Sequence, residues 1–312
     1  MMELAAHETR PDANEGQSRE HRTIDLPGGR TLGYAEYGDA AGLPVFAFHG
    51  TPGSRFMFRL VDEPARRLGL RIIAPDRPGF GLSSHQDNRR LADWPEDVLA
   101  LAGKLGIGRF AVAGISGGGP YTAACAALLP ENVIAAALIS PVGPLHAPEG
   151  PENLPAAQIV TFRLLPHLTP AMRGAFSLGR IMFFNAPGTM YKMVMRRAGP
   201  ADEPILSRPE IKKNLLAGVI EGFRQGALGV VEEMKIFASP WNIPIEAIRC
   251  PVLFWQGTAD NNVPVAASLH LAGIIPNCTL NRIEGAGHYW IFDHFEDVLL
   301  ALKQQMEAAR TR

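Results

Sequence analysis

Six short, continuous apolar runs constrain the fold of this chain more than any other feature of its sequence. Each run is followed by glycine or proline residues and then by a stretch with helical character. Runs of Val, Ile, Phe and Ala without polar alternation are typical of strands buried on both faces, as in a parallel sheet covered by helices. The runs lie at residues 44–50, 71–76, 109–116, 133–140, 251–257 and 279–288.

Helical stretches alternate with these runs, as the crossover connections of a parallel sheet require. We expect them at residues 55–69, 93–105, 117–129, 265–274 and 291–309. Before the first run, alternating residues on both sides of a Pro-Gly-Gly turn at 27–29 predict a hairpin of two short strands. The sequence therefore predicts an α/β fold with a mostly parallel sheet flanked by helices.

One long gap interrupts the alternation of strands and helices. Residues 141–249 contain no convincing strand but hold 13 of the 26 prolines, and proline ends a helix after a few turns. We expect this segment to be a cap, or lid, of short helices inserted into the sheet domain. The expected organisation is a disordered polar tail at 1–20, a core domain formed by 21–140 and 250–312, and a helical cap at 141–249.

The charge and cysteine content exclude several classes of protein. Thirty Lys and Arg residues and 31 Asp and Glu residues give a net charge of −1, which argues against nucleic-acid binding and against a polybasic membrane patch. No apolar stretch reaches the ~18 residues of a membrane span, and the first residues do not resemble a signal peptide. Three widely spaced cysteines form no Cys-x-x-Cys motif. We therefore expect a cytoplasmic protein.

The segment GISGG at 114–118 is the strongest candidate for a catalytic motif. It matches Gly-x-Ser-x-Gly and lies between an apolar run and a helix of small residues. A nucleophilic serine on such a turn needs neighbours without Cβ atoms, because the turn is strained and packs against the adjacent strand and helix. Ser116 is therefore the expected nucleophile. The alternative is a glycine-rich turn that only packs.

A nucleophilic serine needs a histidine base and a carboxylate that orients this base. His288 closes a glycine-rich loop after the last apolar run, and Asp260 follows the run at 251–257. The chain order Ser116, Asp260, His288 is the order of the triad in one fold family. Asp293 is the weaker alternative for the acid, because it shares a predicted helix with two other acidic residues.

Five motifs in this order resemble those of the α/β-hydrolase superfamily, in particular small bacterial hydrolases with a lid. The motifs are HGTPGS (49–54), DRPGFGLS (76–83), GISGGGP (114–120), WQGTAD (255–260) and GAGH (285–288). The resemblance implies that the backbone N–H groups of Thr51 and Gly117 form an oxyanion hole. It also implies that His49, Asp76 and Arg77 hold loops in place.

The resemblance further implies a serine hydrolase that acts on small to medium carboxylic esters or lactones through an acyl-enzyme, with no metal or organic cofactor. A proline iminopeptidase-like amidase remains an alternative, although this chain has Thr51 and Gly119 where those enzymes usually have Gly and Ser. A carbon–carbon bond hydrolase, a cofactor-free haloperoxidase and a non-catalytic receptor for a small ligand also remain open. The protein is expected to be a monomer or a homodimer.

The predicted cap is apolar and contains six of the ten methionines together with several phenylalanines. Flexible thioethers and aromatic rings suit a pocket for an acyl or aromatic group. Basic residues at helical spacing in the cap are expected to form a solvated face, namely Lys192, Arg196 and Arg197. The expected substrate contacts are Tyr289 and Trp290, which follow the base, and Phe183 and Phe184 of the cap.

Overall fold

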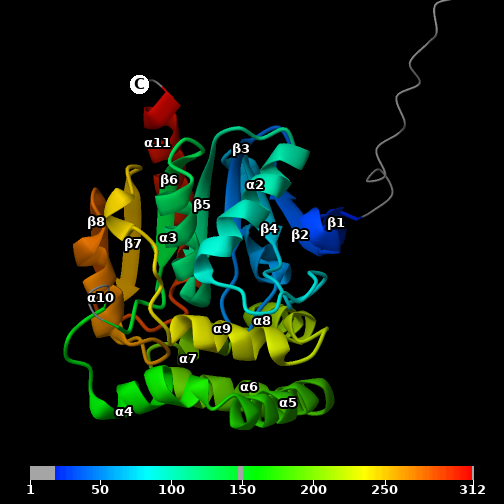
Figure 1. The fold of residues 1–312 in the computed structure, drawn as a ribbon, viewed down its shortest axis with the longest axis vertical. Coiled ribbons are helices and arrows are strands. Elements are labelled where there is room, and N and C mark those ends of the chain that lie inside the picture. The colour runs from blue at the N-terminus through cyan, green and yellow to red at the C-terminus, as the bar shows by residue number, and fades with distance from the viewer. Residues whose placement is uncertain (1–17, 147–149, 311–312) are drawn as a thin grey trace, which may run out of the picture.

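The computed structural model of the chain describes residues 18–146 and 150–310. Its centre is an eight-stranded sheet with the order β1-β2-β4-β3-β5-β6-β7-β8 (Figure 1). The strands are β1 (Arg22–Asp25), β2 (Thr31–Gly38), β3 (Leu43–Phe48), β4 (Leu70–Pro75), β5 (Phe110–Ile115), β6 (Val133–Ile139), β7 (Val252–Gly257) and β8 (Cys278–Ile283). β2 pairs antiparallel with β1 and β4, and all other pairs are parallel. The predicted fold class is confirmed.

The central strands are buried on both faces, as their continuous apolar runs predict. In β3, Phe46 and Phe48 pack in one core cluster, whereas Val45 and Ala47 pack in another. Successive side chains of a strand point to opposite faces, so the two clusters lie on opposite sides of the sheet. The helices that flank the sheet are α1 (Asp62–Arg67), α2 (Trp94–Lys104), α3 (Gly119–Leu128), α10 (Val265–Ile274) and α11 (Ile291–Arg310).

One element differs from its predicted form, and another is shorter than its apolar run. Residues 55–69, expected to be one helix, form the 3₁₀ helix η2 (Arg55–Val61) followed by α1, because Pro64 lacks the N–H that would continue a helix from η2. The apolar run at 279–288 is a strand only as far as Ile283, and the glycine-rich loop predicted for His288 follows it. Gly285 has a φ of 72°, which breaks the extended conformation. His288 therefore lies in a loop beyond the sheet.

The first described residues are attached to the core. Of the predicted disordered tail at 1–20, residues 1–17 lie outside the described residues. Arg19 donates to the Gly38 carbonyl at 2.9 Å, and the Glu20 carboxylate accepts from Arg59 at 2.7 and 2.8 Å. Arg19 and Glu20 therefore contact the core, although the sequence predicts that the core starts at residue 21.

Between β6 and β7, the described residues form helices and loops and contain no strand. The helices are α4 (Ala156–Gln158), α5 (Thr169–Asn185), α6 (Pro187–Ala198), α7 (Glu203–Leu206), α8 (Pro209–Gly222) and α9 (Leu228–Phe237). Figure 1 shows α8 and α9 against the core, and α4, α5 and α6 farther from the sheet. We call residues 156–198 the outer layer. None of the helices in residues 18–146 and 150–310 is both long and apolar enough to cross a membrane.

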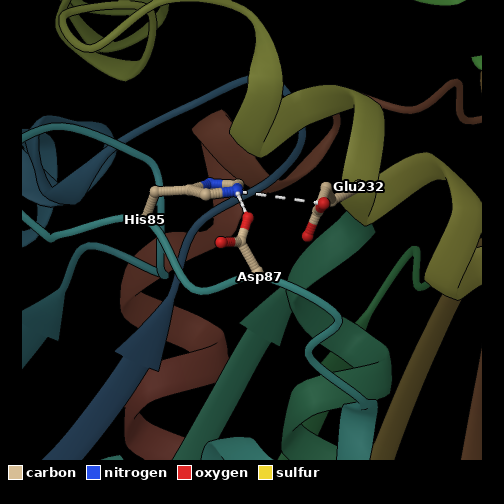
Figure 2. A group of neighbouring side chains, drawn as sticks. All are labelled: His85, Asp87 and Glu232. Carbon is tan, nitrogen blue, oxygen red and sulfur yellow. Dashed lines mark ion pairs between the residues drawn. The ribbon is translucent and has the colours of Figure 1, made fainter. Parts of the chain in front are cut away.

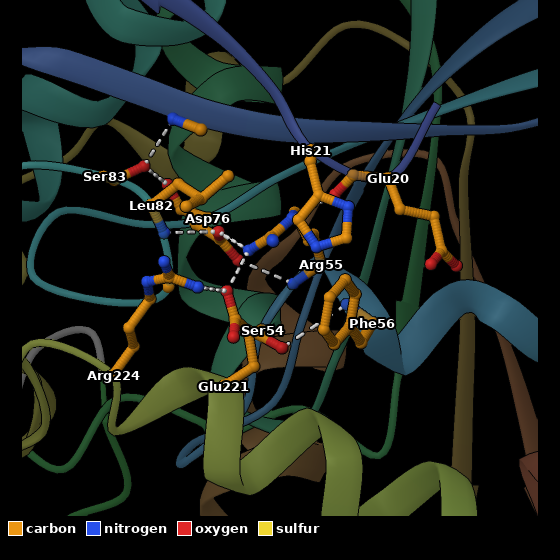
Figure 3. Close-up of polar contacts among 12 residues, drawn as sticks. Glu20, His21, Ser54, Arg55, Phe56, Asp76, Leu82, Ser83, Glu221 and Arg224 are labelled. Carbon is orange, nitrogen blue, oxygen red and sulfur yellow. Dashed lines mark hydrogen bonds and ion pairs between the residues drawn. The ribbon is translucent and has the colours of Figure 1, made fainter. Parts of the chain in front are cut away.

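A buried ion cluster joins α8 to the core (Figure 3). The fully buried Arg55 contacts Asp76 at 2.5 Å and Glu221 of α8 at 2.9 Å. Asp76 also accepts the backbone N–H groups of Arg55 and Leu82 at 2.7 and 3.0 Å. A buried charge without a partner is costly. These contacts therefore fix α8 relative to the loop that follows β4.

Asp76→Asn should lower the free energy of unfolding by about 3 kcal/mol, because it removes one of the two charges that compensate Arg55. Urea unfolding followed by circular dichroism measures this change. The control is Glu63→Gln, which removes a carboxylate from exposed pairs with Arg66 and Arg67. It should change stability by less than about 1 kcal/mol. Equal effects of the two variants would contradict a structural role for the buried cluster.

Candidate active site

The carboxyl ends of the parallel strands meet at one edge of the sheet, and the loops after β3, β5, β7 and β8 carry the predicted site residues. Ser116 directly follows β5 and is half-buried. Its φ of 56° lies in the left-handed region, which a residue with a Cβ atom rarely adopts. A strained serine between a strand and a helix is the geometry of a nucleophile elbow.

Gly117 leaves room for Thr51 beside this serine. A Cβ atom at Gly117 would lie 2.2 Å from Thr51 Oγ1, so only glycine fits without a shift of the loop. Among the residues that the structure describes, neither the Thr51 N–H nor the Gly117 N–H donates a hydrogen bond to the protein. Backbone donors without a protein partner normally bind water or a ligand. Both N–H groups can therefore donate to an oxygen atom of a bound molecule.

His288 and Asp260 form a buried hydrogen-bonded pair. His288 Nδ1 lies 2.7 Å from Asp260 Oδ2. Asp260 Oδ1 accepts the backbone N–H groups of Asn262 and Val263 at 2.8 and 3.2 Å. Burial opposes ionisation of Asp260, but His288 and these N–H groups hold the pKa of its carboxyl below the usual range. An ionised Asp260 therefore fixes the orientation of the imidazole.

The structure places Ser116 at the same edge of the sheet as this pair, without a hydrogen bond between them. Within the described ranges, His288 is bonded through Nδ1 to Asp260, and its Nε2 has no protein partner. Hydrogen bonds between catalytic groups are often long until a substrate binds. Asp293, the weaker alternative for the acid, instead pairs with Arg208 at 2.6 Å.

Asp202 is a further acidic residue at this site. Its two carboxylate oxygens accept the backbone N–H groups of His288 and Tyr289, both at 2.8 Å. A Cβ atom at Gly287 would lie 2.3 Å from this carboxylate, so the second glycine of GAGH permits the close approach. Burial raises the pKa of Asp202. Asp202 lies between α6 and α7. It therefore attaches the loop that carries His288, which we call the histidine loop, to the helices between β6 and β7, which we call the helical segment.

Glu233 of α9 holds the loop that contains Thr51. Its carboxylate accepts from Arg77 Nε at 2.6 Å and from the Thr51 hydroxyl, and both Arg77 and Glu233 are fully buried. Arg77 also donates to the His49 carbonyl at 2.5 Å, and Arg89 lies 3.5 Å from Glu233. Burial opposes ionisation of Glu233, but the charge of Arg77 lowers its pKa to about 2. This ion pair links α9 to the loop that follows β3.

Local sequence contains little information about these two carboxylates. Asp202 contacts a loop 86 residues away, and Glu233 contacts a threonine 182 residues away. The one available signal is the pair Glu232 and Glu233 inside a mostly apolar helix. When a helix with two adjacent carboxylates packs on a core, a carboxylate that becomes buried needs a partner. Only the tertiary contacts show which glutamate is buried and which residue pairs with it.

The aromatic residues expected to contact substrate lie in different environments. Trp290 is 4% exposed, packs in the core and donates its indole N–H to Ser140 Oγ at 3.0 Å. Trp290 is therefore a core residue and not the predicted substrate contact, because the start of α11 turns its ring toward the sheet. Tyr289 is half-buried, with its ring 5.3 Å from the His288 ring. Its contact with substrate stays a prediction.

The two predicted contacts between β6 and β7, Phe183 and Phe184, differ in exposure. Phe183 is buried and stacks on Phe223 at 6.1 Å within the helical segment. Phe184 is 46% exposed on α5, with Arg180 over its ring at 4.9 Å. Phe183 therefore packs helices together and Phe184 faces solvent, because adjacent residues of a helix point in different directions.

A separate group of potential metal ligands lies at α9 (Figure 2). His85 Nε2 is 3.2 Å from Asp87 and 3.8 Å from Glu232, and the ligand atoms of the three residues lie within 4.8 Å of one another. Imidazole and carboxylate groups can bind divalent cations, but the Asp87 side chain is 86% exposed. The contacts of His85 join its loop to α9, and we assign no metal to them.

Comparison with known proteins identifies similar sequences and structures. A family model described as the alpha/beta hydrolase family matches residues 45–301. A non-heme chloroperoxidase from Streptomyces lividans is 26% identical over 287 residues, which cover 88% of this chain and 95% of the relative. Lipase 1 from Psychrobacter immobilis is 26% identical over 298 residues, which cover 93% and 86%. A thermophilic esterase structure from Thermogutta terrifontis has a TM-score of 0.66 at 21% identity, covering 93% of this chain and 97% of that chain.

Glu233→Gln should destabilise the protein by about 3 to 5 kcal/mol at neutral pH, because Arg77 and Arg89 lose their buried counter-charge. A carboxyl with a lowered pKa stabilises the fold above its ordinary pKa of 4.5, and this contribution is lost as pH falls toward about 2. The difference between wild type and variant should therefore shrink over that range. Urea unfolding at a series of pH values measures it.

Glu232→Gln is the matched control on the same helix. Among the described residues, the one salt bridge of Glu232 is its 3.8 Å contact with His85, so its replacement should change stability by less than about 1 kcal/mol. A difference between wild type and Glu233→Gln that is the same at every pH would show that Glu233 is not the ionised partner of Arg77.

Proposed function

This chain belongs to the alpha/beta hydrolase family, and on that premise we propose that it is a serine hydrolase of small to medium carboxylic esters or lactones. The observation that carries the proposal is the 2.7 Å contact between His288 and Asp260 at the sheet edge where Ser116 has a positive φ. The similarity to a lipase supports ester chemistry. The two backbone N–H groups beside the serine loop support acyl transfer.

In the proposed reaction, His288 Nε2 takes the hydroxyl proton of Ser116 while Oγ bonds to the carbonyl carbon. The backbone N–H groups of Thr51 and Gly117 stabilise the negative charge that develops on the carbonyl oxygen. His288 then gives the proton to the leaving alcohol, and the acyl group stays on Ser116. Water that loses a proton to His288 adds to the acyl carbon, the bond between this carbon and Ser116 Oγ breaks, and His288 returns the proton to Ser116 as the acid leaves. Asp260 stabilises the imidazolium in both steps, and no metal or organic cofactor is needed.

The helical segment has two proposed tasks in this reaction. Residues 141–249 act as a cap over a core domain formed by 21–140 and 250–312, and Tyr289 contacts the substrate beneath it. Asp202 and Glu233 are positioning residues, since they hold the loops of His288 and Thr51 without touching the reacting atoms.

We also propose a cytoplasmic location, because the three cysteines are free thiols.

A cofactor-free haloperoxidase is the second candidate, because the similarity to the Streptomyces chloroperoxidase covers 88% of this chain. The same serine, histidine and aspartate would serve in that reaction. Halogenation of an indicator with hydrogen peroxide and bromide, measured beside ester hydrolysis, distinguishes the two. Halogenation without ester hydrolysis would favour the second candidate.

Ser116→Ala should abolish hydrolysis in a panel of aryl esters of increasing acyl length, lactones and proline amides. Asp260→Asn should lower kcat by up to ~10⁴-fold, because the amide no longer holds the correct tautomer of His288. Asp293→Asn is the matched control, since Asp293 pairs with Arg208 instead, and it should keep wild-type kcat. Near-native kcat in Asp260→Asn would disprove the assignment of the acid.

A further inference from the structure

The outer layer exposes a concentrated set of apolar side chains. Eight of the 13 large hydrophobic residues that are exposed in the described part of the chain fall within residues 160–193, and each is 39% to 59% exposed. Scattered exposed leucines are ordinary, whereas a cluster marks an interaction surface. The eight are Val160, Leu164, Leu165, Leu168, Leu178, Ile181, Phe184 and Met193.

The helix α5 exposes several large apolar side chains to solvent. Leu178 and Ile181 are three residues apart and share one helix face with the exposed Ala171. The other face carries Phe176 and Phe183, which pack in an apolar cluster with residues of α8. A surface helix normally presents charged and polar side chains to water. The solvent face of α5 therefore needs an explanation that packing within the protein does not supply.

The charge of this segment is opposite to that of the rest of the chain. Residues 153–201 contain six Lys and Arg residues and no Asp or Glu, which leaves 24 basic and 31 acidic residues elsewhere. Within residues 18–146 and 150–310, none of the six forms a salt bridge, and the nearest pairs along the chain begin at Arg208. The six are Arg163, Arg173, Arg180, Lys192, Arg196 and Arg197.

Basic and apolar side chains lie side by side in the outer layer. α6 exposes Lys192, Arg196 and Arg197 next to Met193, and α6 packs against α5 in the layer farthest from the sheet (Figure 1). This combination is typical of helices that lie in the interface of an anionic membrane. The net charge of −1 for the whole chain argues against a basic membrane patch. However, the acidic excess elsewhere in the chain hides the positive charge of residues 153–201, which contain no acidic residue.

We propose that the outer layer docks on the surface of an anionic lipid bilayer. The apolar side chains of α5 enter the boundary between headgroups and acyl chains, and the basic side chains of α6 contact lipid phosphates. A second copy of the chain is a poorer partner, because a symmetric contact would place these positive charges against one another. A nucleic acid would leave the apolar side chains in water.

Flotation of the full chain with vesicles of phosphatidylcholine and phosphatidylglycerol tests the proposal, with pure phosphatidylcholine vesicles as the comparison. Binding to the anionic vesicles should be at least about tenfold tighter. It should weaken between about 0.05 M and about 0.5 M salt, because salt screens exposed charges. No binding, or equal binding to both vesicles, would overturn the proposal. The measurement does not depend on catalysis, so it is independent of the proposed function.

Two double variants separate the apolar from the basic contribution. Leu178→Ser with Ile181→Ser, and Lys192→Gln with Arg196→Gln, should each weaken binding to the anionic vesicles by at least about tenfold. All four side chains are exposed, so circular dichroism and thermal unfolding should match wild type.

The matched control is Leu280→Ser with Leu300→Ser, which replaces leucines that are 40% and 41% exposed on β8 and α11. This variant should bind vesicles like wild type. Two outcomes would contradict membrane docking. One is that both double variants of the outer layer bind the anionic vesicles as tightly as wild type. The other is a dimer in sedimentation experiments that dissociates in Leu178→Ser with Ile181→Ser, which would show that this face mediates self-association.

Discussion

The buried ion pair between Arg77 and Glu233 is the contact on which the geometry of the candidate site depends. Both side chains are inaccessible to water, and such a pair is stable only when other hydrogen bonds complete it. Here the Thr51 hydroxyl and the His49 carbonyl supply those bonds. One interaction therefore fixes the loop after β3 and, at the same time, places α9 above it. The orientation of the Thr51 N–H beside the serine loop follows from this contact.

Other carboxylates of the segment between β6 and β7 also contact the core. Asp202 accepts two backbone N–H groups from the histidine loop, and Glu221 pairs with the buried Arg55. Asp202, Glu221 and Glu233 all come from the segment between β6 and β7, and each contacts the core. The inner side of this segment is therefore part of the site framework. Its outer layer has no such contacts and presents apolar and basic side chains to solvent, which suits a role in docking.

Local patterns predict the features that depend on short stretches of chain. Continuous apolar runs identify the parallel strands, because burial on both faces removes polar residues from them. The contact between Asp260 and His288 can be predicted from the sequence, since each residue lies in a loop at the same sheet edge. The contacts of Asp202 and Glu233 cannot be predicted in this way, because their partners are distant in sequence. Trp290 was misassigned for a related reason, since adjacency to His288 says nothing of the turn into α11 that buries its ring.

The central claim is that Ser116 is an activated nucleophile, and covalent labelling tests it most directly. A fluorophosphonate reacts with a serine hydroxyl that a neighbouring base activates, and peptide mass spectrometry identifies the modified residue. One adduct is expected, on Ser116, and it should form much more slowly in Asp260→Asn. Folded protein that carries no adduct on Ser116 would contradict the account and would favour a ligand-binding protein that has the fold but not the chemistry.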